Sequence, residues 1–289
     1  MLQVRRIRPE DKKRVFEIAA KIWEDDDYVP AVFEDWVKDE SSIFAAVLHE
    51  EELVGFGRMC NLGNGDFWLE GLRKDPDSNI SGVGKAISTY MFDHLRKHKF
   101  NSLRFSTYFD NQASVKINEK RGFERILTLS LKMRDLKTDF EDFNNIDSNP
   151  DLDELMTYLE ESSYLKMCKR FLAKGWVVYP YNKDLIKKLL NEKKIAVYRE
   201  NDNICGAIIA TDTHYIQEWW ISFLEGESEE IIQTLLSYAD WQATKLKKKE
   251  LLVLLPDSCL QKEVCVKDGF GSWEQENDFF LYELPLELL

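Results

Sequence analysis

One run of the sequence constrains the fold more than any other, because a strand, a proline-containing turn and two glycines lead into an amphipathic helix. The run reads Gly71-Leu72-Arg73-Lys74-Asp75-Pro76-Asp77-Ser78-Asn79-Ile80-Ser81-Gly82-Val83-Gly84-Lys85-Ala86. The first amides of a helix have no partner inside the helix, and the helix dipole adds positive potential there. Glycines let the backbone approach a ligand closely, so the run predicts a phosphate-binding loop.

Several known patterns compete for this run. A Walker loop requires Ser or Thr where Ala86 stands and a glycine where Asn79 stands, so it fails at both positions. A Rossmann fingerprint requires a third glycine where Ile87 stands. A plain strand-to-helix turn that binds no ligand remains an alternative.

The run also resembles the acetyl-CoA loop of the GNAT acetyltransferases, V-x-P-x-x-[QR]-G-x-G-[IV]-G-x-A-[LI]. Residues 74–87 align with it without gaps, and Asn79 and Ile80 depart from it, since Arg or Gln and then Gly are usual there. A second stretch, residues 110–123, resembles the signature D-N-x-x-A-x-x-x-Y-x-K-x-G-F that follows in the same family. Together the resemblance covers about residues 3–135.

The resemblance implies that acetyl-CoA is the co-substrate and that no metal takes part. Amides of the loop would hold the pyrophosphate, and groups of the preceding strand, with Asn111, would contact the pantetheine. Basic side chains near the loop add positive charge. The expected cofactor-binding residues are Leu72, Arg73, Lys74, Asn79, Ile80, Ser81, Gly82, Val83, Gly84, Lys85 and Asn111.

Three residues are candidates for the chemistry. Acetyl transfer to an amine requires a group that takes the amine proton and a way to stabilise the departing thiolate. Glu70 is the candidate general base, because the family places a carboxylate on this strand; an ordinary exposed carboxylate is the alternative. Asn118 stands where the family has a Tyr that protonates the thiolate, and an amide cannot do so. Tyr108 could substitute, the thiolate could leave without a protein acid, or the domain could have lost catalysis.

The order of the expected elements predicts an α+β fold with two GNAT-like domains, 1–137 and 150–289. Each would be a mostly antiparallel twisted sheet flanked by helices. Lys120-Arg121-Gly122-Phe123 is echoed by Lys267-Asp268-Gly269-Phe270, which suggests an internal duplication. Helical stretches are expected at about 152–173 and 183–193. The second domain is expected to be degenerate and to bind no CoA, because residues 224–230 lack GxG and are acidic.

The composition limits the classes of partner that the chain is expected to bind. The net charge is −13, and residues 1–145 carry 23 basic and 26 acidic side chains, so most of the excess lies later in the chain. An acidic chain of this kind disfavours nucleic acid and anionic membranes. The five cysteines form no CxxC pair, the start has no apolar signal region and no apolar run is long enough to span a bilayer, so a cytoplasmic location is expected. The oligomeric state stays open.

The acceptor is expected at residues 23–30, where four carboxylates in a row stand beside aromatic rings and would suit a cationic amine; a solvated acidic helix end is the alternative. This loop weakly resembles tandem GNAT proteins of the histidine N-acetyltransferase type, which points to a free amino acid or a similar small amine. A non-catalytic acyl-CoA sensor or scaffold and a protein or peptide acetyltransferase remain alternative functions.

Overall fold

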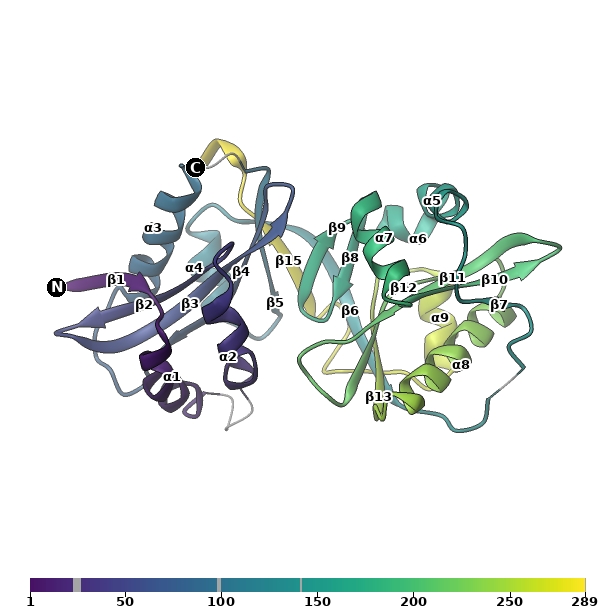
Figure 1. Ribbon diagram of the computed structural model, residues 1–289, viewed down its shortest axis with the longest axis horizontal. Coiled ribbons are helices and arrows are strands. Elements are labelled where there is room, and N and C mark those ends of the chain that lie inside the picture. Colours follow the sequence, from purple (N-terminus) through teal and green to yellow (C-terminus); the bar gives the residue numbers. More distant parts are fainter. Residues whose placement is uncertain (23–26, 98–99, 141, 289) are drawn as a thin grey trace. The chain divides into compact units, whose positions relative to one another are not determined.

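The computed structural model describes residues 1–22, 27–97, 100–140 and 142–288. The chain forms two compact units that interleave in sequence (Figure 1). Unit 1 comprises Met1–Phe105, Glu119–Glu124 and Glu283–Leu289, and unit 2 comprises Ser106–Asn118 and Arg125–Tyr282. Compact units need not share boundaries with the halves of a duplicated chain, so the division into domains 1–137 and 150–289 stays a prediction.

Unit 1 is a twisted sheet with helices on both faces. Its strands follow the order β1-β2-β3-β4-β5, with antiparallel pairs up to β4 and a parallel β4–β5 pair. The strands are β1 (Leu2–Arg6), β2 (Ile43–His49), β3 (Glu52–Gly63), β4 (Asp66–Lys74) and β5 (Ser102–Tyr108), whose last residues belong to unit 2. The helices are η1 (Pro9–Asp11), α1 (Lys12–Ala19), α2 (Val29–Lys38), α3 (Val83–Leu95) and η3 (Leu286–Leu288).

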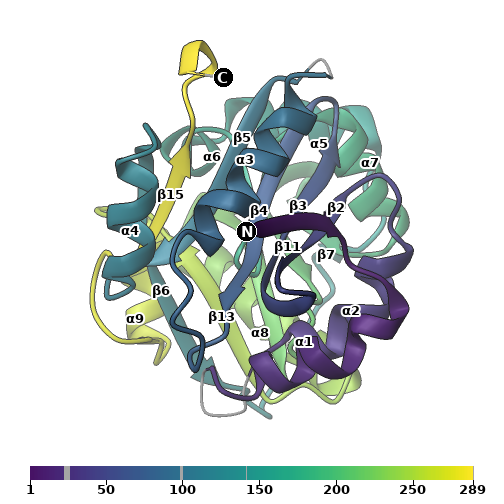
Figure 2. The same ribbon diagram turned by 90° about the vertical axis from the view of Figure 1, so that its left-hand side faces the viewer.

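The alternation of side chains along β3 explains why helices cover both faces of this sheet. Phe56 points into a core with Val15 and Ile18 of α1 and Phe33 of α2. Its neighbour Gly55 faces the other way, toward α3, which packs across β1–β4 (Figure 2). The sheet therefore separates the α1–α2 layer from the helix that follows the glycine loop.

A bulge interrupts the pairing of β3 with β4 next to the loop. Phe56 pairs with Arg73 and Arg58 pairs with Glu70, so Gly71 and Leu72 together face the single residue Gly57. On its other side β4 pairs with β5 only from Asp66 to Trp68. Within the described residues, the second half of β4 is therefore paired on its β3 side alone.

Unit 2 repeats the plan of unit 1. The pairs β10–β11 and β11–β12 are antiparallel and β12–β13 is parallel, with α8 between the parallel strands, as in the series β2 to β5 with α3. The elements that lie wholly or mostly in unit 2 are α4 (Gln112–Glu119), β6 (Glu124–Asp135), β7 (Ile146–Asp147), α5 (Leu152–Glu161), α6 (Ser163–Met167), β8 (Phe171–Lys174), β9 (Val177–Pro180), α7 (Lys183–Asn191), β10 (Ile195–Glu200), β11 (Asn203–Thr211), β12 (Glu218–Gly226), α8 (Glu229–Lys245), β13 (Glu250–Leu255), α9 (Leu260–Lys267), β14 (Gly271–Ser272) and β15 (Phe279–Glu283).

The final strand of each repeat pairs with the other repeat. In unit 2, β6 pairs with β13 from Asp135 opposite Glu250 to Ser130 opposite Leu255. In unit 1, the Leu284 amide donates to the Leu103 carbonyl at 2.9 Å, and Glu283 pairs with Arg104. Strand β6, which precedes the predicted boundary at 137–150, therefore belongs to the sheet of unit 2, and the chain returns at Glu283 and Leu284 to strand β5 of unit 1.

The end of one expected helix is wrong. Residues 171–173, the last of the expected stretch 152–173, belong to strand β8 (Phe171–Lys174), which pairs with β9. The helical part ends earlier, because Lys169 and Arg170 adopt φ of 52° and 58°, which no right-handed helix accommodates. The helix expected at 183–193 is present as α7.

We expect Gly55→Ala to destabilise the protein. The added Cβ would lie 2.5 Å from a Val83 methyl and 2.7 Å from the Arg73 carbonyl oxygen, and a backbone atom cannot yield cheaply. Overpacking of this kind costs about 1–3 kcal/mol. Urea unfolding measures the loss, and Gly271→Ala is the control, since a Cβ there meets nothing within 4 Å. Equal unfolding midpoints for the two variants would contradict the close approach of α3 to β3.

Candidate functional site

Helix α3 begins without a capping side chain. Its N-cap, Gly82, has φ 82° in the left-handed region, and the first helical bond runs from the Ala86 amide to the Gly82 carbonyl. No acidic residue lies in the first turn. The equivalent helix of unit 2, α8, differs: Ser228 accepts from the Ile231 amide, and Glu229 and Glu230 lie in its first turn. The start of α3 is therefore suited to an anion and the start of α8 is not.

The loop before α3 is fixed by a buried carboxylate. Asp75 is 3% exposed, and it pairs with Arg14 at 2.5 Å and with Lys21 at 3.1 Å, both of the α1 region. It also accepts from the Asp77 amide at 3.1 Å, which holds the turn after Pro76. Asn79, Ser81 and Lys85 stay exposed. Ion pairs thus hold the base of the loop while its tip remains open to solvent.

Arg121 lies at the same helix start. Its Nη2 is 3.7 Å from the position that a Cβ on Gly84 would occupy, and burial lowers the pKa of its guanidinium. A half-buried cation beside the positive end of a helix is favoured when an anion binds both. Sequence reasoning missed this role, because only the fold brings a residue 37 positions along the chain to Gly84.

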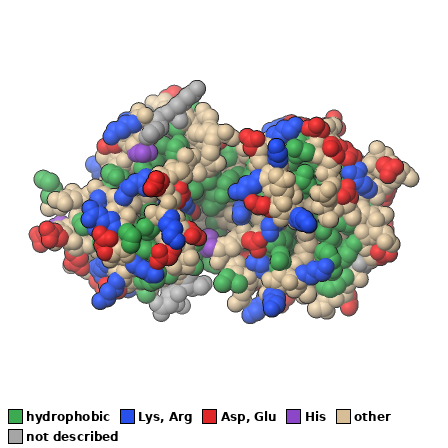
Figure 3. Space-filling model, viewed as in Figure 1, with side chains coloured by type: hydrophobic (Ala, Val, Ile, Leu, Met, Phe, Trp, Pro, Cys, Tyr) green, Lys and Arg blue, Asp and Glu red, His purple; other side chains and the backbone are tan. Residues whose placement is uncertain are grey.

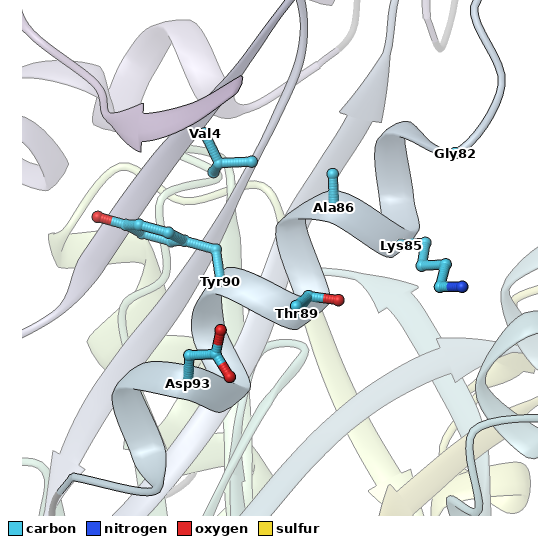
Figure 4. A pocket seen from close by; sticks show the side chains of 7 residues that line it. All are labelled: Val4, Gly82, Lys85, Ala86, Thr89, Tyr90 and Asp93. Carbon is cyan, nitrogen blue, oxygen red and sulfur yellow. The ribbon is translucent and has the colours of Figure 1, made fainter. Parts of the chain in front are cut away.

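An open groove runs along the outer side of α3, starting at Gly82. Its volume is about 480 Å³, and Figure 4 shows Tyr90 and Asp93 farther along the helix and Val4 of β1 across from it. The remaining lining residues are Lys85, Ala86 and Thr89. The groove therefore continues from the glycine loop along the exposed side of the helix.

On β4, Glu70 belongs to a group of largely buried side chains that we call the Arg58 cluster. Its members are Trp36, Asp39, Ser42, Arg58 and Glu70. Arg58 pairs with Glu70 through Nη1 and with Asp39 through Nη2, the latter at 2.6 Å. Its guanidinium lies 4.8 Å from the centre of the Trp36 ring. Glu70 is therefore not the ordinary exposed carboxylate that was the alternative, since its side chain is 12% exposed.

The pKa values of the two carboxylates of this cluster are shifted in opposite directions. Burial raises the pKa of Glu70 above its ordinary value, and the charge of Arg58 opposes part of that rise. The pKa of Asp39 is lowered to about 2: burial raises it, but hydrogen bonds from Ser41, Ser42 and Arg58 lower it by more. The cluster thus holds one carboxylate that stays ionised and one whose proton affinity is increased, which is what a general base near neutral pH requires.

The Arg73 side chain is already engaged. Its Nε bonds Asp27 Oδ2 at 2.6 Å, and its guanidinium lies 5.6 Å from the Tyr28 ring. Asp27 is 1% exposed in its side chain and also accepts from the Val29 amide. Arg73 could therefore contact a ligand only through its backbone, and Asp27 is not available to an acceptor ammonium. Residues 23–26, the rest of the expected acidic acceptor loop, lie outside the described residues.

Gly71 lets an aromatic side chain lie directly on β4. It has φ 63°, and a Cβ there would lie 2.9 Å from two Trp36 ring atoms. The next residue, Leu72, is 43% exposed. The structure thus places Glu70, Leu72, Arg73 and Lys74 along one strand, and Asn79 to Lys85 in the loop and helix start that follow it.

Asn111, Asn118 and Tyr108 belong to unit 2. Asn111 Oδ1 accepts from the Ser114 amide at 3.2 Å at the start of α4. Asn118 is 7% exposed, and its Nδ2 donates to the Ser114 carbonyl at 2.9 Å. Tyr108 packs edge-to-face on Trp273 with ring centres 5.5 Å apart, and burial raises its pKa. Both Asn side chains thus have local structural bonds.

Residues 6–123 match the model of the acetyltransferase (GNAT) family. This stretch is a GNAT acetyltransferase domain. The family transfers an acyl group from acyl-CoA to an amine. No curated protein sequence matches the chain.

Solved structures share the fold over nearly the whole chain. A GCN5-related N-acetyltransferase from Sphaerobacter thermophilus has a TM-score of 0.66 at 13% identity, over 98% of this chain and 95% of that one. A tandem GNAT protein from the clavulanic acid biosynthesis pathway has 0.58 at 11%, over 98% of both chains. A GCN5-related N-acetyltransferase from Kribbella flavida has 0.53 at 15%, over 97% of this chain and 70% of that one. At these identities the likeness shows the fold, which is mixed, mostly antiparallel and flanked by helices as predicted.

The surface of the GNAT domain carries both signs of charge. On the face of unit 1 drawn in Figure 3, Lys and Arg side chains are interspersed with Asp and Glu, in keeping with the near balance of the first half of the chain.

In the described ranges, no cluster of three or more His, Cys, Asp or Glu could hold a metal ion. No helix among the same residues is long and apolar enough to cross a membrane.

Proposed function

We propose that this GNAT domain transfers an acetyl group from acetyl-CoA to the primary amine of a small molecule, such as a free amino acid. The Arg58–Glu70 pair on β4 carries the proposal. Arg58 bonds one oxygen of the Glu70 carboxylate, and this carboxylate lies on the strand that leads directly into the glycine loop. The low exposure of Glu70 supports an acceptor slim enough to reach it rather than a broad protein surface. We expect the protein to act in the cytoplasm.

The proposed chemistry begins with the acceptor as an ammonium ion. Glu70 takes a proton from it, and the neutral amine attacks the thioester carbonyl carbon. A C–N bond forms and the C–S bond breaks. The nitrogen releases its second proton to solvent as the amide forms, and the sulfur leaves as a thiolate that takes a proton from solvent, or from Tyr108 as the alternative from the sequence.

The proposed substrate site uses the amides of Gly82, Val83, Gly84 and Lys85 for the pyrophosphate, together with the side chains of Lys85 and Arg121. The second half of β4, paired on its β3 side only, offers backbone groups to the amides of the pantetheine arm. Leu72, Arg73 and Lys74 supply them. Asn79 and Ile80, where the family has Arg or Gln and then Gly, leave the tip of the loop less basic, and we propose that Arg121 compensates.

Gly84→Ala tests the binding of acetyl-CoA without disturbing the fold. A Cβ on Gly84 would lie 3.7 Å from Arg121 and 3.8 Å from Leu72, which are ordinary contacts, so unfolding should stay unchanged. The methyl group would keep phosphate away from the amides at the helix start, and we expect the Kd for acetyl-CoA to rise at least roughly tenfold. Calorimetry measures this Kd. Unchanged affinity at unchanged stability would place the pyrophosphate elsewhere.

Thiol release tests the function itself. Protein and acetyl-CoA are incubated with free amino acids, polyamines or short peptides, and free CoA is measured with a thiol reagent. Release with single amino acids or polyamines, and mass spectra that show the acetylated amine, would support the proposal. Release with peptides alone would contradict the small-molecule acceptor in favour of a peptide or protein acceptor.

A second candidate function is an acyl-CoA sensor or scaffold without turnover. Asn118 favours this second function, because it stands where the family has the Tyr that protonates the thiolate. The Asn118 side chain is buried and donates to the Ser114 carbonyl. Binding of acetyl-CoA without thiol release on any amine would support this candidate over transfer.

A further inference from the structure

The Arg58 guanidinium is held in one position. Its two terminal nitrogens bond different carboxylates, Glu70 through Nη1 and Asp39 through Nη2, and Nη2 also lies 3.5 Å from Ser42 Oγ. Trp36 covers it at 4.8 Å. Its Nε is buried and has no hydrogen-bond partner in the described part of the chain. With partners fixed on both ends and an aromatic ring beside it, Arg58 cannot turn away from Glu70 without losing Asp39.

Glu70 is consequently bonded on one side only. Arg58 takes Oε1, whereas Oε2 accepts no hydrogen bond from any described residue, and the side chain keeps 12% exposure. The charged or titratable groups that face it are Arg58 and Cys60 from β3 and Asp39 after α2. Burial raises the pKa of Cys60 to about 11, so this thiol adds no charge near neutral pH.

We propose that Arg58 is a positioning residue, which fixes one carboxylate oxygen of Glu70 and leaves the other to take the proton of the acceptor amine, and that Asp39 holds Arg58 in that position. The inference rests on the proposed acetyl transfer. Arg58 itself cannot supply or accept the proton, because a guanidinium stays protonated in proteins. Its contribution is the orientation and the charge of Glu70.

Arg58, which pairs with Glu70, and Asp39, which pairs with Arg58, act on the pKa of Glu70 in opposite directions. The positive charge of Arg58 favours the ionised carboxylate, and the negative charge of Asp39 favours the protonated one. The cluster holds two carboxylates and one guanidinium, and so it carries one excess negative charge when both acids are ionised. Removing the charge of Arg58 should therefore raise the pKa of Glu70, and removing the charge of Asp39 should lower it.

The experiment compares Arg58→Gln, Asp39→Asn and Arg58→Lys with the parent protein. The pH dependence of kcat/KM has an acidic limb where Glu70 loses its proton. We expect Arg58→Gln to move the midpoint of this limb up by about one pH unit or more. Asp39→Asn should move it down, and Arg58→Lys, which keeps the charge, should stay nearest the parent. Arg5→Gln is the control, because it breaks the Arg5–Asp11 pair of unit 1 outside the cluster.

A second readout does not need turnover. The carboxyl carbon of Glu70, labelled with ¹³C and assigned by its loss in Glu70→Gln, is titrated by NMR in the same variants. The inference is overturned if rates fall in the variants while the NMR midpoint of Glu70 and the acidic limb both stay in place. This comparison uses Asp39→Asn and Arg58→Lys, and also Arg58→Gln where that variant folds. The cluster would then be merely structural. If the NMR midpoints move as expected but no amine releases thiol, the charge relation holds while the proposed transfer, and the positioning role with it, is wrong.

Discussion

Glu70→Gln should lower kcat at least roughly tenfold at neutral pH, within the usual range for the loss of an acid–base group. Gln keeps the shape of the side chain, and its carbonyl oxygen can still accept from Arg58, but it cannot take a proton from an ammonium. The Kd for acetyl-CoA should change little, because Glu70 lies on β4 before the glycine loop. The unfolding midpoint should fall, because Arg58 then keeps Asp39 as its carboxylate partner but loses the charge of Glu70, so kcat is measured at a temperature where both proteins are folded. Steady-state thiol release across pH 6–9 gives kcat for both proteins.

The control for this variant is Glu34→Gln, which removes a carboxylate from α2 whose side chain is 56% exposed and pairs with Lys12. Its kcat should equal that of the parent. A Glu70→Gln protein with the parent kcat at every pH would show that no proton passes through this carboxylate. The attacking amine would then lose its proton to water or to another group.

Asp240→Asn should cause the largest loss of stability, about 3–5 kcal/mol. Asp240 is 1% exposed, and Arg134 binds both its oxygens at 2.8 and 2.7 Å. It also accepts from the Lys137 amide at 3.1 Å. The neutral amide would leave a buried guanidinium with Asp268 as its only carboxylate in the described ranges, and one of the amide's two ends would present hydrogens where an acceptor is needed.

Urea unfolding followed by tryptophan fluorescence measures this loss. Asp153→Asn is the matched control, because Asp153 pairs with Lys183 on the surface of the same unit with a side chain 83% exposed, and surface pairs contribute little. Similar midpoints for the two variants would mean that the Arg134–Asp240 pair is balanced by its desolvation cost and does not hold β6 to α8.

Local sequence was sufficient for the loop and the strand before it. The glycines at 82 and 84, the proline at 76 and the carboxylate at 70 are a few residues apart, so their spacing alone indicates a strand, a turn and an uncapped helix. Local runs of apolar residues also place several strands of both units along the chain, but they do not give the order in which these strands pair. The roles of Glu70, Asn118 and the loop residues stay predictions until variants are measured.

Contacts across the fold could not be predicted in the same way. The bulge opposite Gly57 brings Arg58 opposite Glu70. Gly71, whose φ is 63°, lies in this bulge, but a glycine in a strand does not by itself give the register of the two strands. Asp27 looked like part of an acidic acceptor loop, but tertiary packing pairs it with Arg73. The strand at 171–174 was missed because Lys169 and Arg170, whose positive φ ends the helical stretch, are not residue types that mark a turn in a sequence.

Calorimetric titration with acetyl-CoA tests the central claim most directly. The account predicts one equivalent bound per chain, at the start of α3, because Ser228, Glu229 and Glu230 satisfy the start of α8. Binding of one equivalent that weakens in Gly84→Ala would place the acyl donor at the glycine loop. Absence of binding, or two equivalents of equal affinity, would contradict it.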